Sequence, residues 1–298
     1  MQFRQLGNSG LEVSLIGLGC NNFGARMTLD EARPVVHTAL DLGINLFDTA
    51  DSYGAGSSEE VLGELLGARR KDIVLTSKVG LSLETTPRSV MHVTRDYIMS
   101  SVEASLRRLN TEWIDLYQLH ALHRDADIEE ILRAMEDLVT QGKVRHIGCC
   151  NMPAWQVVDA DWVARNNGLG AFVSSQNEYS LLLREPEKEV IPALRDKGMS
   201  MLPFYPLGAG VLTGKYRKGG AIPAGSRLDK VPTIADRYFT DENMDIVEAL
   251  RDFAEARGHT LLELSFAWLA SCDVIPSIIA GASRAEQVTA NVDAVVWQ

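Results

Sequence analysis

The chain has 298 residues, of which 46% are hydrophobic and 23% charged, so it is long and apolar enough to bury a sizeable core. Its net charge is −11, and an acidic surface repels phosphate backbones, which argues against nucleic acid as a partner. The sequence has no run of about 20 apolar residues and no apolar run at its N-terminus, so neither a membrane span nor a secretory signal is expected.

The four cysteines carry no metal or redox signature. Cys20, Cys149, Cys150 and Cys272 include no CxxC spacing, and the adjacent pair is poorly placed for a disulfide. Reduced thiols are the simplest interpretation, and they predict a cytoplasmic protein without a structural metal.

The first elements in chain order are a hairpin and a series of buried strands. Residues 2–14 predict a β-hairpin that turns at Gly7–Gly10 and lies across the N-terminal end of the structure that follows. Short apolar runs with little alternation then predict strands buried on both faces. These runs are residues 15–18, 44–47, 73–76, 114–119, 144–149, 172–175, 199–203 and 277–279.

Amphipathic stretches with apolar residues at three- and four-residue spacing separate these strands. They predict helices at 29–42, 58–66, 94–109, 128–140, 153–165, 186–195, 261–270 and 284–293. Strand-then-helix order, repeated about eight times, predicts a parallel sheet closed into a (β/α)8 TIM barrel. Residues 205–240 form a long loop after strand 7, and no linker divides the chain, so we expect a single domain over 1–298.

Polar residues stand at the ends of six predicted strands. In a barrel of this kind the carboxyl ends of the strands carry the active site. One such residue alone would indicate surface charge, but six in register indicate a site. They are Asp48, Lys78, His120, Asn151, Gln176 and Ser283.

Tyr53 lies five residues beyond Asp48 in the segment DTADSYG. A free tyrosine has a pKa of ~10, and the ammonium of Lys78 is expected to lower it toward neutrality. Asp48 would hold Lys78 charged, and His120 would donate a hydrogen bond to a substrate carbonyl oxygen. The set predicts carbonyl reduction in which Tyr53 gives a proton to oxygen.

Other sites are disfavoured by spacing. Gly17, Gly19 and Gly24 lack the GxGxxG pattern of a Rossmann site, and the run 209–216 lacks the first glycine and the Ser or Thr of a P-loop. His120 and His123 lack carboxylate support at ligand spacing, so no metal site is expected.

Several segments resemble the aldo-keto reductase superfamily. They are RQLGNSGLEVSLIGLGCNNFG (4–24), FDTADSYG (47–54), LTSKVG (75–80), DLYQLH (115–120), GKVRHIGCCN (142–151), SQNEYSLL (175–182), PLGAGVLTGKY (206–216) and GASRAEQVTAN (281–291). The resemblance covers nearly the whole chain in order. It implies a catalytic tetrad of Asp48, Tyr53, Lys78 and His120, and a small carbonyl or alcohol substrate.

The resemblance also implies the contacts of an NADP(H) cofactor. Asn151 and Gln176 would hold the nicotinamide carboxamide, Phe204 would stack on its ring, and Ser283 and Arg284 would meet the adenine and ribose-phosphate end. The implied cofactor contacts are Gly19, Asn21, Asp48, Cys150, Asn151, Gln176, Phe204, Tyr205, Pro206, Leu207, Gly208, Leu212, Lys215, Gly281, Ser283, Arg284, Gln287 and Asn291.

This sequence departs from the family pattern at several positions. Cys150 and Tyr205 replace serines, Ala280 replaces a proline, and the chain stops at Gln298, so a substrate-covering C-terminal loop is expected to be absent. Some barrels of this type are accessory subunits of potassium channels that retain cofactor binding. The intact tetrad favours an enzyme over such a binding protein; the oligomeric state stays open.

Overall fold

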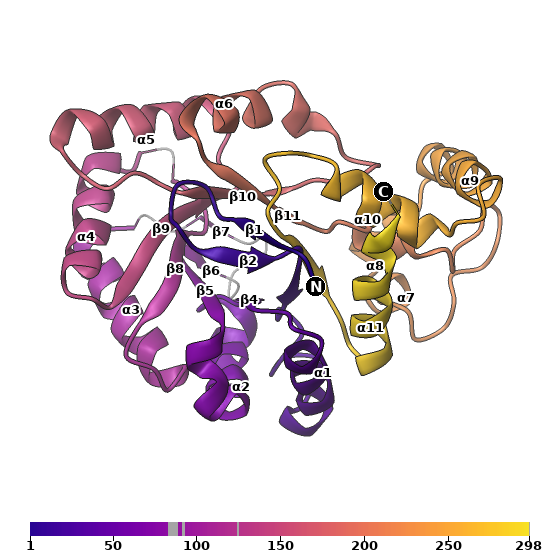
Figure 1. Ribbon diagram of the computed structural model, residues 1–298, viewed down its shortest axis with the longest axis horizontal. Helices are drawn as coiled ribbons and strands as arrows, with labels where there is room; N and C mark the ends of the chain where they lie inside the picture. Colours follow the sequence, from indigo (N-terminus) through magenta and orange to yellow (C-terminus); the bar gives the residue numbers. More distant parts are fainter. Residues whose placement is uncertain (83–88, 91–92, 124, 298) are drawn as a thin grey trace.

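The structure is a computed structural model that describes residues 1–82, 89–90, 93–123 and 125–297. Eight parallel strands form one sheet that curls into a nearly closed barrel (Figure 1). In spatial order they are β11 (Ser200–Phe204), β10 (Ser174–Glu178), β9 (Val144–Cys150), β8 (Ile114–Leu119), β5 (Val74–Val79), β4 (Leu46–Asp48), β3 (Ile16–Gly19) and β12 (Ile278–Gly281).

The two edge strands of the sheet approach one another at the seam. Met201 N–H in β11 donates to Val274 O, just before β12, at 2.7 Å. The predicted (β/α)8 TIM barrel is therefore confirmed, and each predicted strand overlaps an observed one.

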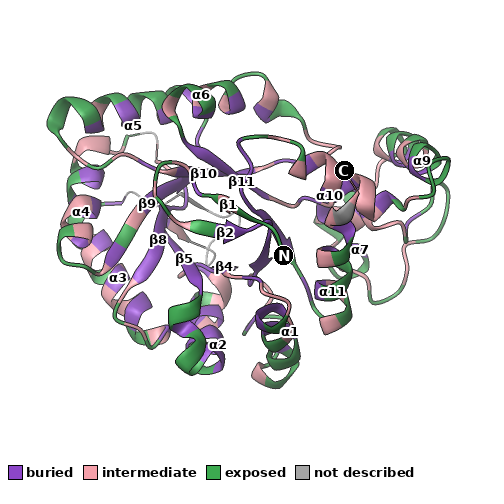
Figure 2. Cartoon of the chain, viewed as in Figure 1, coloured by how far each residue is buried: buried purple, intermediate pink, exposed green. Residues whose placement is uncertain are grey.

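Helices surround the barrel, with their buried residues facing it and their exposed residues facing outward (Figure 2). Each predicted helix is present, and the first begins where Thr28 accepts a hydrogen bond from Glu31 N–H while the Glu31 carboxylate accepts one from Thr28 N–H. Their bounds are α1 (Leu29–Asp41), α2 (Ser57–Leu66), α3 (Arg95–Arg108), α4 (Ile128–Thr140), α5 (Ala154–Asn167), α6 (Val190–Lys197), α10 (Leu261–Ala270) and α11 (Ala285–Asp293).

The predicted N-terminal hairpin consists of β1 (Phe3–Gln5) and β2 (Glu12–Ser14), paired antiparallel. It lies across the amino-terminal end of the barrel: Gly7 N–H donates to Ser200 Oγ at 2.7 Å, and Arg4 Nη1 donates to Ile275 O at 2.9 Å. Gly7 has φ +50°, and a Cβ there would lie 2.3 Å from Val173 O, so only glycine fits this close approach.

The long connection after β11 contains helices that the sequence did not predict. They are α7 (Arg227–Lys230), α8 (Pro232–Tyr238) and α9 (Asp241–Glu255), which project beyond the ring of barrel helices (Figure 1). A separate apolar cluster beneath them joins Leu212 and Tyr216 to Tyr238 and Val247. A short antiparallel pair, β6 (Leu81–Ser82) and β7 (Ser89–Val90), was also not predicted.

The barrel interior changes character along its axis. Leu46, Val74, Leu116 and Leu202 form an apolar cluster at the amino-terminal end, which the hairpin residue Leu6 closes. Two residues further along β4, β5 and β8, on the same face, the side chains become polar. This polar end, called the rim below, is where the predicted site residues gather.

Candidate active site

Lys78 lies at the centre of the polar rim. Its side chain is fully buried, and its Nζ donates to Asp48 Oδ2 at 2.8 Å, to Thr49 O at 2.8 Å and to Tyr53 Oη at 3.3 Å. Asp48 is the last residue of β4, and Lys78 lies near the end of the adjacent β5, so parallel pairing places the two side chains side by side. The structure thus brings together three of the four predicted catalytic residues.

Side chains from three other strands, β5, β8 and β10, hold the carboxylate of Asp48. Its Oδ1 accepts hydrogen bonds from Thr76 Oγ1 at 2.6 Å, Gln176 Nε2 at 2.9 Å and Gln118 Nε2 at 3.5 Å. Lys78 Nζ bonds to Oδ2, so both oxygens of the buried carboxylate have hydrogen-bond partners. These bonds stabilise the negative charge of Asp48 next to the Lys78 ammonium.

The fourth tetrad residue, His120, follows β8 and faces Tyr53. The two rings meet edge to face, with their centroids 5.9 Å apart. His120 Nδ1 and Ser52 Oγ lie 3.4 Å apart, and the backbone carbonyl of His120 accepts from Asn151 Nδ2 at 2.9 Å. Tyr53 and His120 therefore lie on one side of the Lys78–Asp48 pair.

One expectation about Tyr53 is wrong. Burial, the largest influence, raises the pKa of Tyr53 to about 12, although the charge of Lys78 acts in the lowering direction as expected. Asp48 adds a further upward contribution. Burial also acts to lower the pKa of Lys78, but the negative charge of Asp48 and the coupling to Tyr53 outweigh it, so this pKa is raised. Lys78 is a permanent cation, and Tyr53 keeps its proton at neutral pH.

The next two strands present an amide and two aromatic side chains at the rim. Gln176 in β10 donates its Nε2 hydrogen to Asp48, so its Oε1 is the atom offered to a ligand. Phe204 ends β11, and its ring meets that of Tyr205 edge to face at 5.4 Å. Tyr205 has φ +50°, as Asn151 has φ +57°, and left-handed backbone in residues other than glycine is concentrated at functional sites.

The segment after β11 carries the predicted cofactor loop. Pro206 and Gly208 are buried, Leu207 is half-buried, and Leu212 lies within the short helical turn η4 (Gly208–Thr213). Lys215 is exposed, with its Nζ 5.1 Å from the Tyr216 ring centroid.

The opposite side of the rim gathers the remaining predicted residues. Gly19 pairs with Gly281 where β3 meets β12, and a Cβ added at Gly281 would lie 3.9 Å from Asn21 Oδ1. Ser283 N–H donates to Gln287 Oε1 at 2.8 Å. Arg284 caps α11 and is exposed, while Asn291, further along that helix, is buried.

Cys150, one of the departures from the family pattern, is fully buried at the end of β9. Its thiol lies 3.6 Å from Gln118 Oε1, and burial holds its pKa well above its usual value. A neutral thiol here makes a weak contact to the amide that supports Asp48 and adds no charge to the site.

Sequence reasoning missed four residues that touch the site. Thr76 and Gln118 had a signal, because strand alternation puts them on the same face as Lys78 and His120. Ser52 and Arg227 carried no such sequence signal. The place of Ser52 depends on the local turn, and Arg227 reaches the site from α7. Arg227 Nη2 donates to Tyr205 Oη at 3.0 Å, and its Nε is buried without a hydrogen-bond partner among the described residues.

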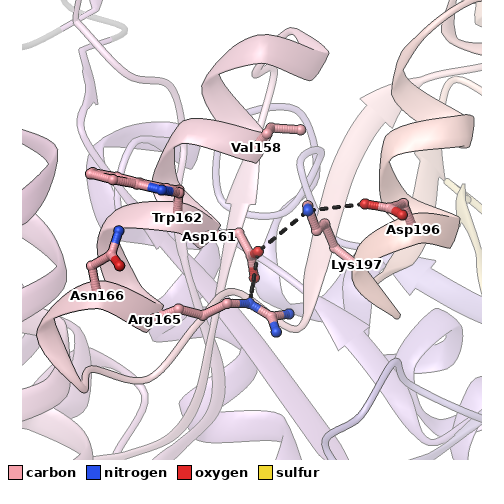
Figure 3. A pocket seen from close by; sticks show the side chains of 7 residues that line it. All are labelled: Val158, Asp161, Trp162, Arg165, Asn166, Asp196 and Lys197. Carbon is pink, nitrogen blue, oxygen red and sulfur yellow. Dashed lines mark hydrogen bonds and ion pairs between the residues drawn. The ribbon is translucent and has the colours of Figure 1, made fainter.

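A surface hollow between α5 and α6 lies apart from these residues (Figure 3). It is lined by Trp162, Arg165 and Lys197 among others, and both cations contact Asp161. Within the described ranges, no three His, Cys, Asp or Glu side chains group as metal ligands, and no helix is long and apolar enough to cross a membrane.

The chain is similar to known proteins over nearly its whole length. Residues 15–298 match the model of the Aldo/keto reductase family. The chain is 34% identical to a probable voltage-gated potassium channel subunit beta of Arabidopsis thaliana, over 99% of this chain and 91% of that protein. It is 32% identical to the L-glyceraldehyde 3-phosphate reductase of Escherichia coli K12, over 99% of this chain and 88% of that protein.

A solved structure with the same fold is an aldo-keto reductase of Bacillus halodurans in its holo form. It superposes with a TM-score of 0.81 at 33% identity, covering 100% of this chain and 92% of that one. The chain belongs to the aldo/keto reductase family. Members of this family generally reduce carbonyl compounds with a nicotinamide cofactor.

Proposed function

We propose that this protein reduces an aldehyde or ketone to an alcohol with NADPH, and that Tyr53 is the general acid. One observation carries the proposal: Tyr53 Oη lies 3.3 Å from Lys78 Nζ, which is itself paired with Asp48 at 2.8 Å. A buried cation next to a phenol stabilises the phenolate, so this arrangement suits Tyr53 to give up its proton during the reaction.

The charge state of Tyr53 suits it to act as an acid. Because its pKa is raised to about 12, Tyr53 is protonated at neutral pH and ready to donate. The substrate carbonyl oxygen would lie against Tyr53 Oη and the His120 ring. As the proton leaves, Lys78 stabilises the phenolate that remains, and Asp48 keeps Lys78 in place. A nicotinamide cofactor held at the rim would supply the hydride for the carbonyl carbon.

Several residues of this chain suit such a cofactor. Asn151 and Gln176 have their amide nitrogens engaged, which orients their carbonyl oxygens to accept hydrogen bonds from a carboxamide. Arg227 lies beside Tyr205, and its Nε is buried without a hydrogen-bond partner among the described residues, so this cation suits a phosphate of the cofactor. Arg284 at the start of α11 suits the 2′-phosphate that distinguishes NADP from NAD. The four free cysteines are compatible with a cytoplasmic location, which is part of this proposal.

The test is Tyr53→Phe, which removes the hydroxyl and keeps the ring. We expect kcat for reduction of a panel of aldehydes and ketones to fall by roughly 10²–10⁴-fold, because one general acid contributes about that much. The Kd for NADPH, measured by fluorescence, should stay within about twofold of wild type. Full turnover by the variant would exclude Tyr53 as the acid.

A second candidate function is a cofactor-binding accessory subunit, favoured by the relatives named as potassium channel beta subunits. The same panel separates the two. A wild-type protein that binds NADPH but oxidises none of it with any carbonyl compound would support the binding role and refute the enzyme.

A further inference from the structure

A second polar cluster lies on the outer side of the barrel sheet, directly behind the tetrad. Ser77 precedes Lys78 in β5, so strand alternation points it away from the interior and toward α2 and α3. Ser77 Oγ donates to Glu59 Oε1 at 2.5 Å, while Arg108 Nε and Nη2 lie 2.7 and 2.6 Å from Glu59 Oε2. Glu59 is fully buried, and both of its oxygens are engaged.

Asp51 lies in the same cluster, but Ser77 and Arg108 bond to Glu59. Asp51 Oδ1 is buried and, in the part of the chain that the structure describes, accepts no hydrogen bond; the same holds for Tyr117 Oη. The cluster thus contains two carboxyl groups and one guanidinium. Arg108 and the Ser77 hydroxyl both serve Glu59, so the burial of Asp51 beside the charge of Glu59 favours the protonated form of Asp51.

The charged and titratable groups around Asp51 come from four elements. Glu59 belongs to α2, Arg108 to α3, Lys78 to β5 and Tyr117 to β8. Burial, followed by the negative charge of Glu59, raises the pKa of Asp51 to about 7, against the opposing effect of Arg108 and Lys78. Asp51 therefore changes its charge in the physiological range, whereas Tyr53 does not.

Asp51 is also joined to the proposed acid through the backbone. It lies two residues before Tyr53, and its N–H donates to Lys78 O at 3.3 Å. Tyr53 N–H in turn donates to Ala50 O at 3.1 Å. A negative charge on Asp51 opposes formation of a second negative charge on Tyr53, and it competes for the stabilising effect of Lys78.

We propose that Asp51 is a positioning residue whose neutral form keeps Tyr53 a competent acid, and that its deprotonation slows proton donation. The inference rests on the proposed carbonyl reduction and deepens it by naming what regulates the site. The rate of reduction then falls as the pH rises through neutrality, because Asp51, on the outer side of the barrel sheet, loses its proton.

The experiment is the pH profile of kcat for carbonyl reduction, from pH 5.5 to 9, in wild type and Asp51→Asn. The amide has the shape of the neutral acid but cannot ionise. We expect the wild-type kcat to fall with a midpoint near the pKa of Asp51. The ratio of variant to wild-type kcat should rise about tenfold across the range, as expected if the negative charge on Asp51 makes Tyr53 about tenfold less acidic. The matched control is Asp159→Asn, an exposed carboxylate on α5, which should follow the wild-type profile.

Two outcomes would overturn the proposal: a wild-type profile without an ionisation between pH 6 and 8, or an Asp51→Asn profile that keeps it. A structural role alone would lower kcat at every pH and leave the shape of the profile unchanged. Loss of the ionisation in Asp159→Asn as well would also count against Asp51.

A direct titration covers the cases in which the variant does not fold or the protein proves not to be a reductase. The ¹³C carboxyl resonance of Asp51 in the wild-type protein should titrate near pH 7, far above the ~4 of an ordinary aspartate. A midpoint below 5 refutes the charge state, whatever the activity. A midpoint near 7 in a protein without turnover would instead refute the proposed reduction, and with it the role of Asp51, while leaving the charge state intact.

Discussion

Lys78 and Asp48 are a fully buried ion pair, and such pairs are costly to desolvate. Their retention is understandable if the charge on Lys78 is needed where a phenolate forms. Asp48 spreads its two oxygens over Lys78, Thr76 and Gln176, so the pair is fixed in one geometry rather than merely neutralised. At the residue scale, the site is therefore organised around the positive charge of Lys78.

For this ion pair we predict a ranking of the losses in kcat when each partner is replaced. Lys78→Met keeps the length of the side chain and removes the charge, so the pKa of Tyr53 should rise further and kcat for reduction should fall by roughly 10²-fold or more. Asp48→Asn should lower kcat less, because Lys78 remains charged although less firmly held. Steady-state rates at a fixed pH test this ranking, and thermal unfolding checks that both variants fold. Equal losses, or a greater loss in Asp48→Asn, would contradict the division of roles.

The identity of these residues could be predicted from sequence, but their electrostatics could not. The position of polar residues at the carboxyl ends of the predicted strands is visible in the chain, and it singled out Asp48, Lys78 and His120. The raised pKa of Tyr53 depends on how deeply the phenol is enclosed, which is a tertiary property. Arg227 was missed for the same reason, since it reaches Tyr205 only because α7 folds over the rim.

At the scale of elements, the observed strands begin up to two residues later than predicted and several run further toward the rim. The apolar runs mark only the apolar portion of each strand, and they stop short of its polar carboxyl end. Polar residues such as Lys78 and Gln176 belong to the strands themselves, because the inner face of the barrel is polar at that end. Helix α9 was missed, although Thr240 caps it and Met244, Val247 and Ala254 are buried along it at helical spacing.

Helix α11 makes a prediction about cofactor choice. Its N-terminus carries Arg284, exposed and without a side-chain cap, where the helix dipole favours an anion. Arg284→Ala should weaken NADPH binding about ten- to a hundredfold, the range of a charge-assisted hydrogen bond, and leave NADH nearly unaffected. Fluorescence titration measures both constants. Arg133→Ala, which removes an exposed cation on α4, is the matched control. Equal wild-type affinities for the two cofactors would refute the proposed preference.

At the scale of the whole molecule, stability and chemistry are placed at opposite ends of one barrel. The interior near the hairpin is filled by apolar side chains, and the interior near the rim by the hydrogen-bonded polar set around Asp48. Leu46 and Asp48 lie two residues apart on one face of β4, and Leu116 and Gln118 do so on β8. The same strands therefore supply both layers, and a change in one layer need not disturb the other.

Leu6 tests that separation. It is fully buried in the hairpin and closes the apolar end of the barrel, so Leu6→Ala should lower the free energy of unfolding by about 2–5 kcal/mol through lost burial and the cavity that remains. Phe3→Ala is the matched control in the same hairpin: Phe3 is 48% exposed, and its loss should cost less than about 1 kcal/mol. Urea unfolding measures both, and kcat and the Kd for NADPH should match wild type in each folded variant. If Leu6→Ala is as mild as Phe3→Ala, the hairpin does not seal the barrel; if it weakens cofactor binding while folded, the two ends are coupled.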